Sequence, residues 1–304
     1  MATSGAAAEG GDEDDGGVPS KAAAPWRVGD VLKGRYVVEE EVAHGAMGSI
    51  WRALDRDLER PVAVKVPSSE CLGDAEFRER FHREVQRLIR LEHPHIVRLY
   101  DVGEHARYPF AVVAFLEGGT LADRVARRGT GTPRRLPTSD LTTWLRPVAD
   151  ALDFIHVRGV VHRDVKPANV LFDATGNPYL ADFGLAKARG QEQSLTPAEH
   201  TVGTAAYLAP ECVLEDRLSP AFDQYSLATT VFEVVTGVLP FSGGDLGTML
   251  QRRLKEDAPR ADAVAPDARL ATGLVGAVAR GLAREPSQRH RSCGDFARAV
   301  LAGA

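Results

Sequence analysis

The N-terminal part of the chain alternates short apolar runs with turn residues, which is typical of an antiparallel meander of strands. Five such runs begin at Tyr36, Ser49, Pro61, Ile96 and Phe110. One stretch with helical periodicity lies among them at 74–91, where apolar residues such as Phe77, Phe81 and Val85 recur at intervals of three or four. We therefore expect a small antiparallel sheet with a single helix.

Helical periodicity dominates the rest of the chain. Helices are predicted at 140–158, 223–236, 246–256, 270–283 and 293–302, short strands at 160–162, 170–172 and 179–181, and a loop at 257–269. Pro147 lies inside the first helix, where proline costs ~3 kcal/mol or marks a kink, but apolar residues on both sides maintain the period. Strands followed by helices predict an α+β fold of two lobes, about 26–116 and about 117–304, joined at 114–118.

Charge is unevenly distributed along the chain. The 304 residues carry a net charge of −5, and residues 1–25 account for −4 of it with five acids and one base. This tail has almost nothing apolar to bury, so we expect it to be disordered. The remainder is close to neutral, so no general attraction to nucleic acid is expected.

The sequence favours a cytoplasmic protein without a membrane segment. No apolar run approaches the ~18 residues that span a bilayer, and no basic segment followed by an apolar one opens the chain. The three cysteines, Cys71, Cys212 and Cys293, lack the spacing of a disulfide framework or a zinc site. A reducing compartment is the simplest interpretation.

The most informative segment is the run His162-Arg-Asp-Val-Lys-Pro-Ala-Asn169, followed thirteen residues later by Asp182-Phe-Gly. Asp164 can accept or orient the proton of an incoming hydroxyl, and Lys166 can neutralise charge on a transferred phosphoryl group. Asn169 and Asp182 offer the hard oxygen ligands that magnesium prefers. Because phosphoryl transfer needs positioning and charge neutralisation more than covalent chemistry, these groups are sufficient for it.

These motifs resemble the bacterial eukaryotic-like serine/threonine protein kinase family over about residues 36–302. The resemblance implies the two-lobed protein kinase fold, a kinase domain at 36–304, and ATP with magnesium, or manganese in its place, as cofactors. It also implies transfer of the γ-phosphoryl group to Ser and Thr hydroxyls of protein substrates, including autophosphorylation with self-association of the chain. Lys166 in this context resembles the Ser/Thr class of the family.

Lys65 ends the apolar run Val62-Ala-Val-Lys, where an unpaired lysine would be costly. In the family, this lysine contacts the α- and β-phosphates and pairs with a glutamate of the N-terminal lobe's helix. Glu84 is the best match by position, beside the apolar residues of the 74–91 helix, and Glu79 is the alternative. Such a pair makes the site switchable, because displacement of the helix would break it.

A glycine-containing segment, Ala43-His-Gly45-Ala-Met-Gly48-Ser-Ile50, precedes Lys65. It resembles the phosphate-covering loop of kinases except that Ala43 stands where the first glycine would be. Gly45 and Gly48 remain, so backbone amides can approach the phosphates. We expect the additional methyl group to stiffen the loop and raise the ATP requirement.

The resemblance further implies an apolar adenine site between the lobes. Its predicted walls are Val42, Ile50, Ala63 and Leu171, and its predicted backbone partners are Ala114, Phe115 and Leu116. Val113, just before this connection, has a small side chain, so we expect an accessible pocket behind the adenine site.

The run Thr201-Val-Gly-Thr-Ala-Ala-Tyr-Leu-Ala-Pro-Glu211 resembles the substrate-facing segment of the family. Thr204 would then lie beside the catalytic loop, and Glu211 would pair with Arg289. Asp223, predicted to open a helix, is expected to accept hydrogen bonds from the backbone of the catalytic loop and to favour the start of that helix.

Residues 185–203 are expected to form the activation segment. Its candidate phosphorylation sites are Thr196 and Thr201, followed by Ser194. Arg163 adjoins Asp164, so a phosphate on this segment could pair with Arg163 and order the segment.

Two alternatives on the same fold remain open at this point. Ala43 is the one feature that favours a nucleotide-binding pseudokinase, since Lys65, Asp164 and Asp182 are all present. A small-molecule kinase is disfavoured by the 201–211 segment, because that segment serves protein substrates in the family.

Overall fold

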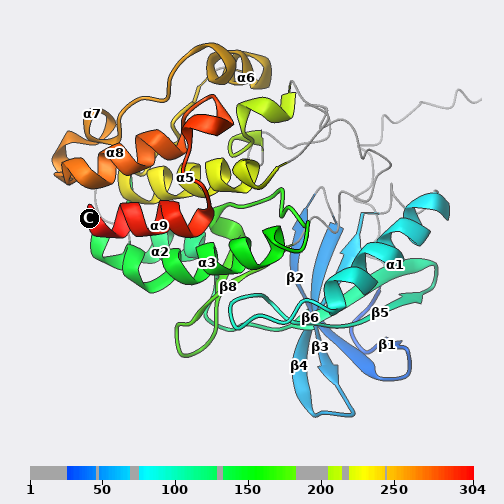
Figure 1. The fold of residues 1–304 in the computed structure, drawn as a ribbon. Helices are drawn as coiled ribbons and strands as arrows, with labels where there is room; N and C mark the ends of the chain where they lie inside the picture. The colour runs from blue at the N-terminus through cyan, green and yellow to red at the C-terminus, as the bar shows by residue number, and fades with distance from the viewer. Residues whose placement is uncertain are drawn as a thin grey trace, which may run out of the picture.

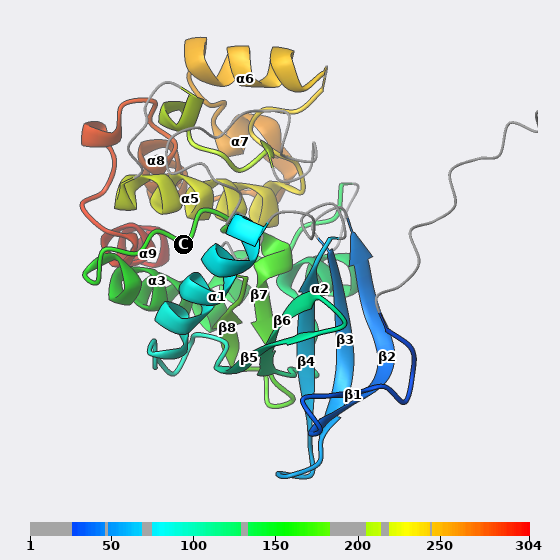
Figure 2. The same ribbon diagram turned by 90° about the vertical axis from the view of Figure 1, so that its right-hand side faces the viewer.

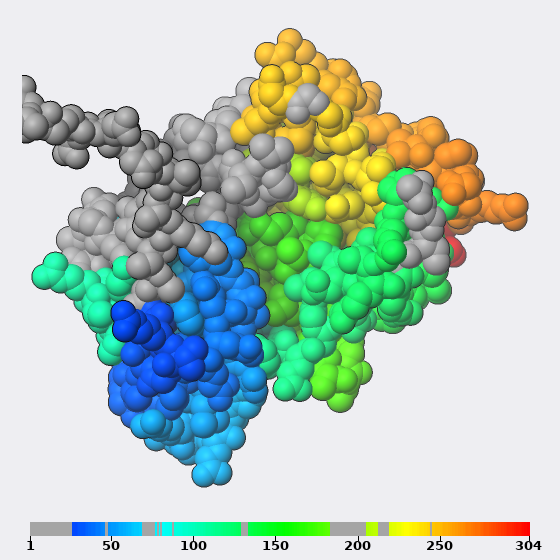
Figure 3. Space-filling view, turned by 180° about the vertical axis from the view of Figure 1, so that it is seen from behind, coloured from blue at the N-terminus to red at the C-terminus, as the bar shows by residue number. Residues whose placement is uncertain are grey.

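The computed structural model describes residues 26–45, 48–68, 75–128, 133–182, 205–213, 219–243 and 245–304. The predicted tail at 1–25 lies outside these residues. The described chain has an N-terminal part built on a sheet and a C-terminal part built mainly of helices (Figure 1). A view turned by 90° shows the sheet on one side and the helices on the other (Figure 2). From behind, the blue N-terminal lobe and the green-to-red C-terminal lobe meet along one boundary (Figure 3).

The N-terminal lobe contains a six-stranded antiparallel sheet in the order β1-β2-β3-β4-β6-β5. Its strands are β1 (Val31–Leu32), β2 (Tyr36–Gly45), β3 (Gly48–Asp55), β4 (Arg60–Pro67), β5 (Leu99–His105) and β6 (Tyr108–Ala114). Alternate residues of β3 are buried, as a strand period of two requires. The predicted meander is confirmed, although β5 begins three residues later and β6 ends two residues earlier than the apolar runs suggested.

The two faces of this sheet bury different apolar clusters. Phe110 and Val112 of β6 pack with Trp26 and Trp51 on one face. On the other face, α1 (Ala75–Ile89) packs against β5 and β6 through Phe77, Phe81 and Val85, which are spaced by four residues. The single predicted helix of this lobe is therefore confirmed.

The C-terminal lobe surrounds a central helix. Its helices are α2 (Leu121–Arg128), α3 (Leu141–His156), α5 (Pro220–Thr236), α6 (Leu246–Lys255), α7 (Ala261–Val264), α8 (Thr272–Gly281) and α9 (Cys293–Ala302). Nearly every residue of α5 is buried, so this helix forms the middle of the large apolar core. The hairpin β7 (Val170–Phe172) and β8 (Pro178–Leu180) lies on the side facing the sheet (Figure 2).

Helix α3 continues through Pro147, as its apolar period predicted. Trp144, Leu145, Val148 and Leu152 on either side of the proline are fully buried. Since tertiary packing provides most of the stability of protein helices, this burial outweighs the local cost of the proline.

Other local predictions are corrected by the structure. The expected strand at 160–162 does not form, because the amide of His162 bonds to the Asp223 carboxylate at 2.7 Å instead of to a neighbouring strand. Helix α5 begins at Pro220, after the N-cap Ser219, so Asp223 lies within its first turn. The predicted loop at 257–269 contains the short α7, and α2 was not among the predicted helices.

Candidate active site

The candidate catalytic loop connects α3 to β7 and includes the 3₁₀ turn η3 (Pro167–Asn169). Asp223, whose side chain is fully buried, holds the start of this loop. One carboxylate oxygen accepts from the amide of His162 at 2.7 Å, and the other accepts from the amide of Arg163 at 2.9 Å. The first oxygen is also 2.7 Å from Nε2 of His156. The predicted bonding of Asp223 to the loop backbone is therefore confirmed.

Three side chains of this loop meet. The Asp164 carboxylate lies 3.0 Å from Nζ of Lys166 and accepts from Nδ2 of Asn169 at 2.8 Å. Asn169 also donates to the backbone carbonyl of Asp164 at 2.7 Å. Asp164 and Lys166 are only 10% and 18% exposed, so their charges interact in a weakly screened environment.

Asp182 joins this group from the segment that follows β8. The amide of Ala181 donates to the carbonyl of Asn169 at 2.9 Å, and the Ala181 carbonyl is 2.8 Å from Nε2 of His162. Both Arg163 and Asp182 have left-handed backbone conformations, with φ of 69° and 63°. Such conformations are sparsely populated by residues other than glycine, and they concentrate at functional sites.

Lys65 reaches the same place from β4 and forms an ion pair with Asp182. Burial lowers the pKa of Lys65 to about 8, and the carboxylate of Asp164 opposes part of this shift. Lys65 of the N-terminal lobe therefore contacts Asp182 of the C-terminal lobe, and the charge of Asp164 also acts on it.

The predicted Lys65–Glu84 pair is not formed in this structure. Glu84 and the alternative, Glu79, both have exposed side chains on α1. The buried stripe of this helix consists of Phe77, Phe81 and Val85, and Glu84 lies beside that stripe. Asp182 is the ion-pair partner of Lys65 in this structure. The pairing of Glu84 with Lys65 stays a prediction.

The glycine-containing segment forms the end of the β2–β3 hairpin, with Ala43 opposite Ile50 and Gly45 opposite Gly48. Gly48 has a φ of 130°, and a Cβ atom there would collide with the carbonyl oxygen of Val66 on β4. Close packing against β4 therefore requires glycine at this position, independently of any phosphate.

Most of the predicted adenine-site residues assemble at the boundary between the lobes. One apolar cluster contains Ile50, Ala63, Val113, Ala114, Phe115, Leu116 and Leu171. Val42 is absent from it, because the register shift between Glu41 and Ala43 places Val42 in a bulge, where it is 51% exposed. A cavity of about 20 Å³ lies behind Val113, beside Lys65 and Asp182, so the expected back pocket has room for about one water molecule.

Glu211 and Tyr207 are among the residues that anchor the described part of the substrate-facing segment. Glu211 and Arg289 form the predicted pair through two parallel bonds of 2.7 Å, both side chains being buried. Tyr207 donates to the carboxylate of Glu233 on α5 at 2.5 Å, and burial raises the pKa of Glu233. Glu233 was not predicted from the sequence, although an acid between Phe232 and Val234 in the apolar run of α5 was the available signal.

The remaining predicted residues of this region lie outside the described residues. They are Ser194, Thr196, Thr201 and Thr204, together with the rest of the activation segment at 185–203.

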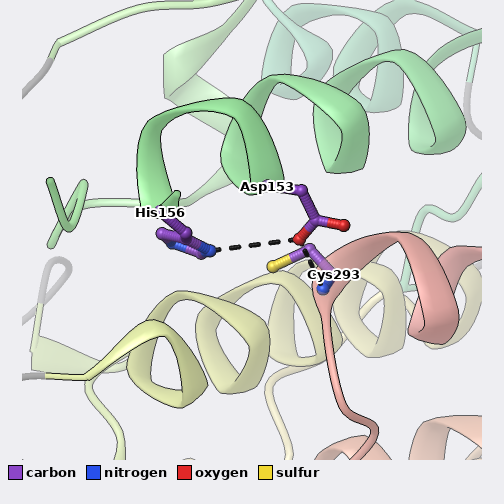
Figure 4. Close-up of side chains that lie close together, drawn as sticks. All are labelled: Asp153, His156 and Cys293. Carbon is purple, nitrogen blue, oxygen red and sulfur yellow. Dashed lines mark hydrogen bonds and ion pairs between the residues drawn. The ribbon is translucent and has the colours of Figure 1, made fainter. Parts of the chain in front are cut away.

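A second cluster of polar side chains lies where α3, α5 and α9 meet. It contains Asp153, His156 and Cys293, whose ligand-type atoms lie within 4.8 Å of one another (Figure 4). Asp153 accepts from the amides of Cys293 and Gly294, each at 2.9 Å, and so satisfies the start of α9. Burial raises the pKa of the Cys293 thiol, which disfavours the thiolate that a metal would need. These contacts indicate a structural junction.

Comparison with known proteins agrees with this fold. The model of the protein kinase domain matches residues 36–296 of the chain. The chain therefore belongs to the protein kinase family. In the described part of the chain, no helix combines the length and the apolar character needed to cross a bilayer.

Several similar relatives within the family come from mycobacteria. Serine/threonine-protein kinase PknL of Mycobacterium tuberculosis is 41% identical over 234 residues, which cover 77% of this chain and 57% of PknL. PknA of the same organism is 38% identical over 281 residues, covering 91% of this chain and 63% of PknA. The chain thus spans about three fifths of these curated relatives. The crystal structure of the M. tuberculosis PknI kinase domain matches with a TM-score of 0.71 at 30% identity, covering 92% of this chain and 100% of that one.

Proposed function

We propose that this chain is a serine/threonine protein kinase that transfers the γ-phosphoryl group of ATP, bound with magnesium, to Ser and Thr hydroxyls of proteins. The observation that supports this most strongly is the convergence of Lys65, Asp164, Lys166, Asn169 and Asp182 at the boundary between the lobes. The proposed kinase unit covers 36–304, and the protein is proposed to act in the cytoplasm.

Each group of the catalytic loop has one part in the proposed transfer. Asp164 receives or orients the proton of the acceptor hydroxyl, and its orientation is fixed by Asn169. Lys166 is a cation beside that carboxylate, so it can neutralise charge on the phosphoryl group as the group moves to the acceptor. Asp223 keeps the loop in place by bonding to its backbone amides.

The residues present fit a divalent cation. Asn169 directs its amide nitrogen to Asp164, which leaves the amide oxygen as a ligand, and Asp182 supplies a carboxylate. Bound magnesium would neutralise charge on the phosphates, and manganese accepts the same oxygen ligands. Lys65 and Asp182 now contact each other, so nucleotide binding must exchange this pair for phosphate and metal contacts.

The proposed acceptors are proteins, including a second copy of this chain. We propose that autophosphorylation at Thr196, Thr201 or Ser194 orders the activation segment through Arg163, which adjoins Asp164. The buried Glu211–Arg289 pair supports a protein acceptor because it holds the end of the segment that faces protein substrates in the family.

The test is transfer from γ-labelled ATP by the purified chain, followed by identification of the phosphorylated residues. Phosphoserine or phosphothreonine in protein, lost in Asp164→Asn, is expected. Nucleotide binding with no transfer to any acceptor would identify a pseudokinase, and label found only on a metabolite would identify a small-molecule kinase; either result overturns the proposal.

A further inference from the structure

Helix α6 carries a buried arginine that no motif predicted. Arg253 is only 2% exposed, whereas the neighbouring Arg252 is on the surface and pairs with Glu256. Met249 and Leu250 share the buried side of the helix with Arg253. Burial of a guanidinium is costly unless its N–H donors are satisfied, so the hydrogen-bond partners of Arg253 indicate its role.

The partners of Arg253 are backbone carbonyls of the substrate-facing segment. Nη1 donates to the carbonyls of Ala205 at 2.8 Å and Leu208 at 2.6 Å, and Nη2 donates to the carbonyl of Ala206 at 2.8 Å. The carbonyl of the remaining residue, Tyr207, accepts from Oγ of Ser226 at 2.8 Å. Side chains therefore hold four consecutive carbonyls, three of them through one guanidinium.

This arrangement fixes residues 205–208 against helices α5 and α6. Tyr207 stands between the residues that Arg253 holds, and its hydroxyl meets Glu233. Burial and the neighbouring Glu233 carboxylate raise the pKa of Tyr207, and the charge of Asp164 makes a smaller contribution in the same direction. Helix α5 bonds to this segment through Ser226 and Glu233, and helix α6 bonds to it through the guanidinium of Arg253.

We propose that Arg253 is a positioning residue for the protein acceptor, which holds residues 205–208 in the conformation that presents an acceptor hydroxyl to Asp164. The inference rests on the proposed function and deepens it. The three hydrogen bonds of Arg253 given above all go to carbonyls of residues 205–208, so we expect its effect to fall on the acceptor side of the reaction. A displacement of helix α6 would therefore change how firmly residues 205–208 are held.

Substitution of Arg253 is expected to separate acceptor binding from nucleotide binding. In Arg253→Met the carbonyls lose a charged donor, and we expect kcat/KM for the acceptor to fall about 10- to 100-fold, mainly through KM. Arg253→Lys keeps a cation that can reach part of the carbonyl group and should restore part of the loss. Affinity for ATP should change less than about twofold in both variants.

The experiment measures transfer to the best member of an arrayed library of Ser- and Thr-containing peptides, beside ATP affinity and hydrogen exchange of the 205–213 amides. Arg252→Met on the same helix is the matched control and should match the wild type in all three measurements. In Arg253→Met, exchange should increase at 205–213 more than in the rest of the C-terminal lobe. If this variant does not fold, the comparison of Arg253→Lys with Arg252→Lys decides.

The outcomes distinguish the two levels of the proposal. Wild-type protein that transfers the phosphoryl group neither to a peptide nor to its own chain refutes the proposed function itself. An active wild type whose Arg253 variants keep the acceptor KM, or lose ATP affinity in parallel with it, overturns the role of Arg253 and leaves the proposed function standing. A selective rise of the acceptor KM with local exchange at 205–213 supports the positioning role.

Discussion

Removal of the Asp223 carboxylate should weaken both the fold and the catalytic loop. In Asp223→Ala the amides of His162 and Arg163 lose acceptors at 2.7 and 2.9 Å in a fully buried site. A buried donor left without its partner costs about 1–3 kcal/mol. The two amides alone give a predicted loss of about 4 kcal/mol in the free energy of unfolding, or about 10 °C in Tm, and loss of the contact with His156 acts in the same direction.

The assay is thermal and urea unfolding followed by circular dichroism, with phosphoryl transfer measured at a temperature where all variants are folded. Asp223→Asn keeps one oxygen acceptor and should lose about half as much, since one of the two amides stays bonded. Asp262→Ala is the control, because Asp262 forms an exposed pair with Arg260 and should change stability by less than about 1 kcal/mol. Equal losses in Asp223→Ala and Asp262→Ala would refute the reasoning.

Three further predictions concern the ion pair of the C-terminal lobe, the lysine of the N-terminal lobe and the hairpin. Glu211→Gln should cost about 3–5 kcal/mol in urea unfolding because it leaves Arg289 buried without its counter-charge, and a change below about 1 kcal/mol would contradict the pairing. The Lys65 ammonium loses its proton as the pH rises through its lowered pKa of about 8, so ATP affinity should fall above that pH in the wild type and stay level in Lys65→Arg; parallel profiles in titration calorimetry would argue against it. Gly48→Ala should weaken ATP binding at least tenfold by displacing the hairpin from Val66, and unchanged affinity would show that the close approach is dispensable.

The sequence predicted best what lies close together along the chain. Asp164, Lys166 and Asn169 lie on one short loop, so their residue types and spacing were enough to predict a shared site. The sheet, α1 and the long helices followed from periodicity, because burial enforces it even through Pro147.

Contacts that depend on the rotation of an element could not be predicted in this way. The sequence favoured Glu84 as the partner of Lys65, but the rotation of α1 is set by its buried phenylalanines, and Asp182 is the partner in the structure. The bulge at Val42 was likewise not evident from the sequence, and the role of Val42 in the adenine site stays a prediction. Arg253 was missed because Arg252 and Arg253 look alike in sequence, and only the packing of α6 shows which one is buried.

In the proposed reaction, Asp164 acts in the transfer of the phosphoryl group, whereas Asp182 and Lys65 serve the bound nucleotide. The most direct measurement is single-turnover transfer from ATP beside equilibrium ATP binding in Asp164→Asn. We expect a rate at least 100-fold below that of the wild type with ATP affinity within about twofold. A variant that loses its affinity for ATP and keeps its rate of transfer would contradict this assignment.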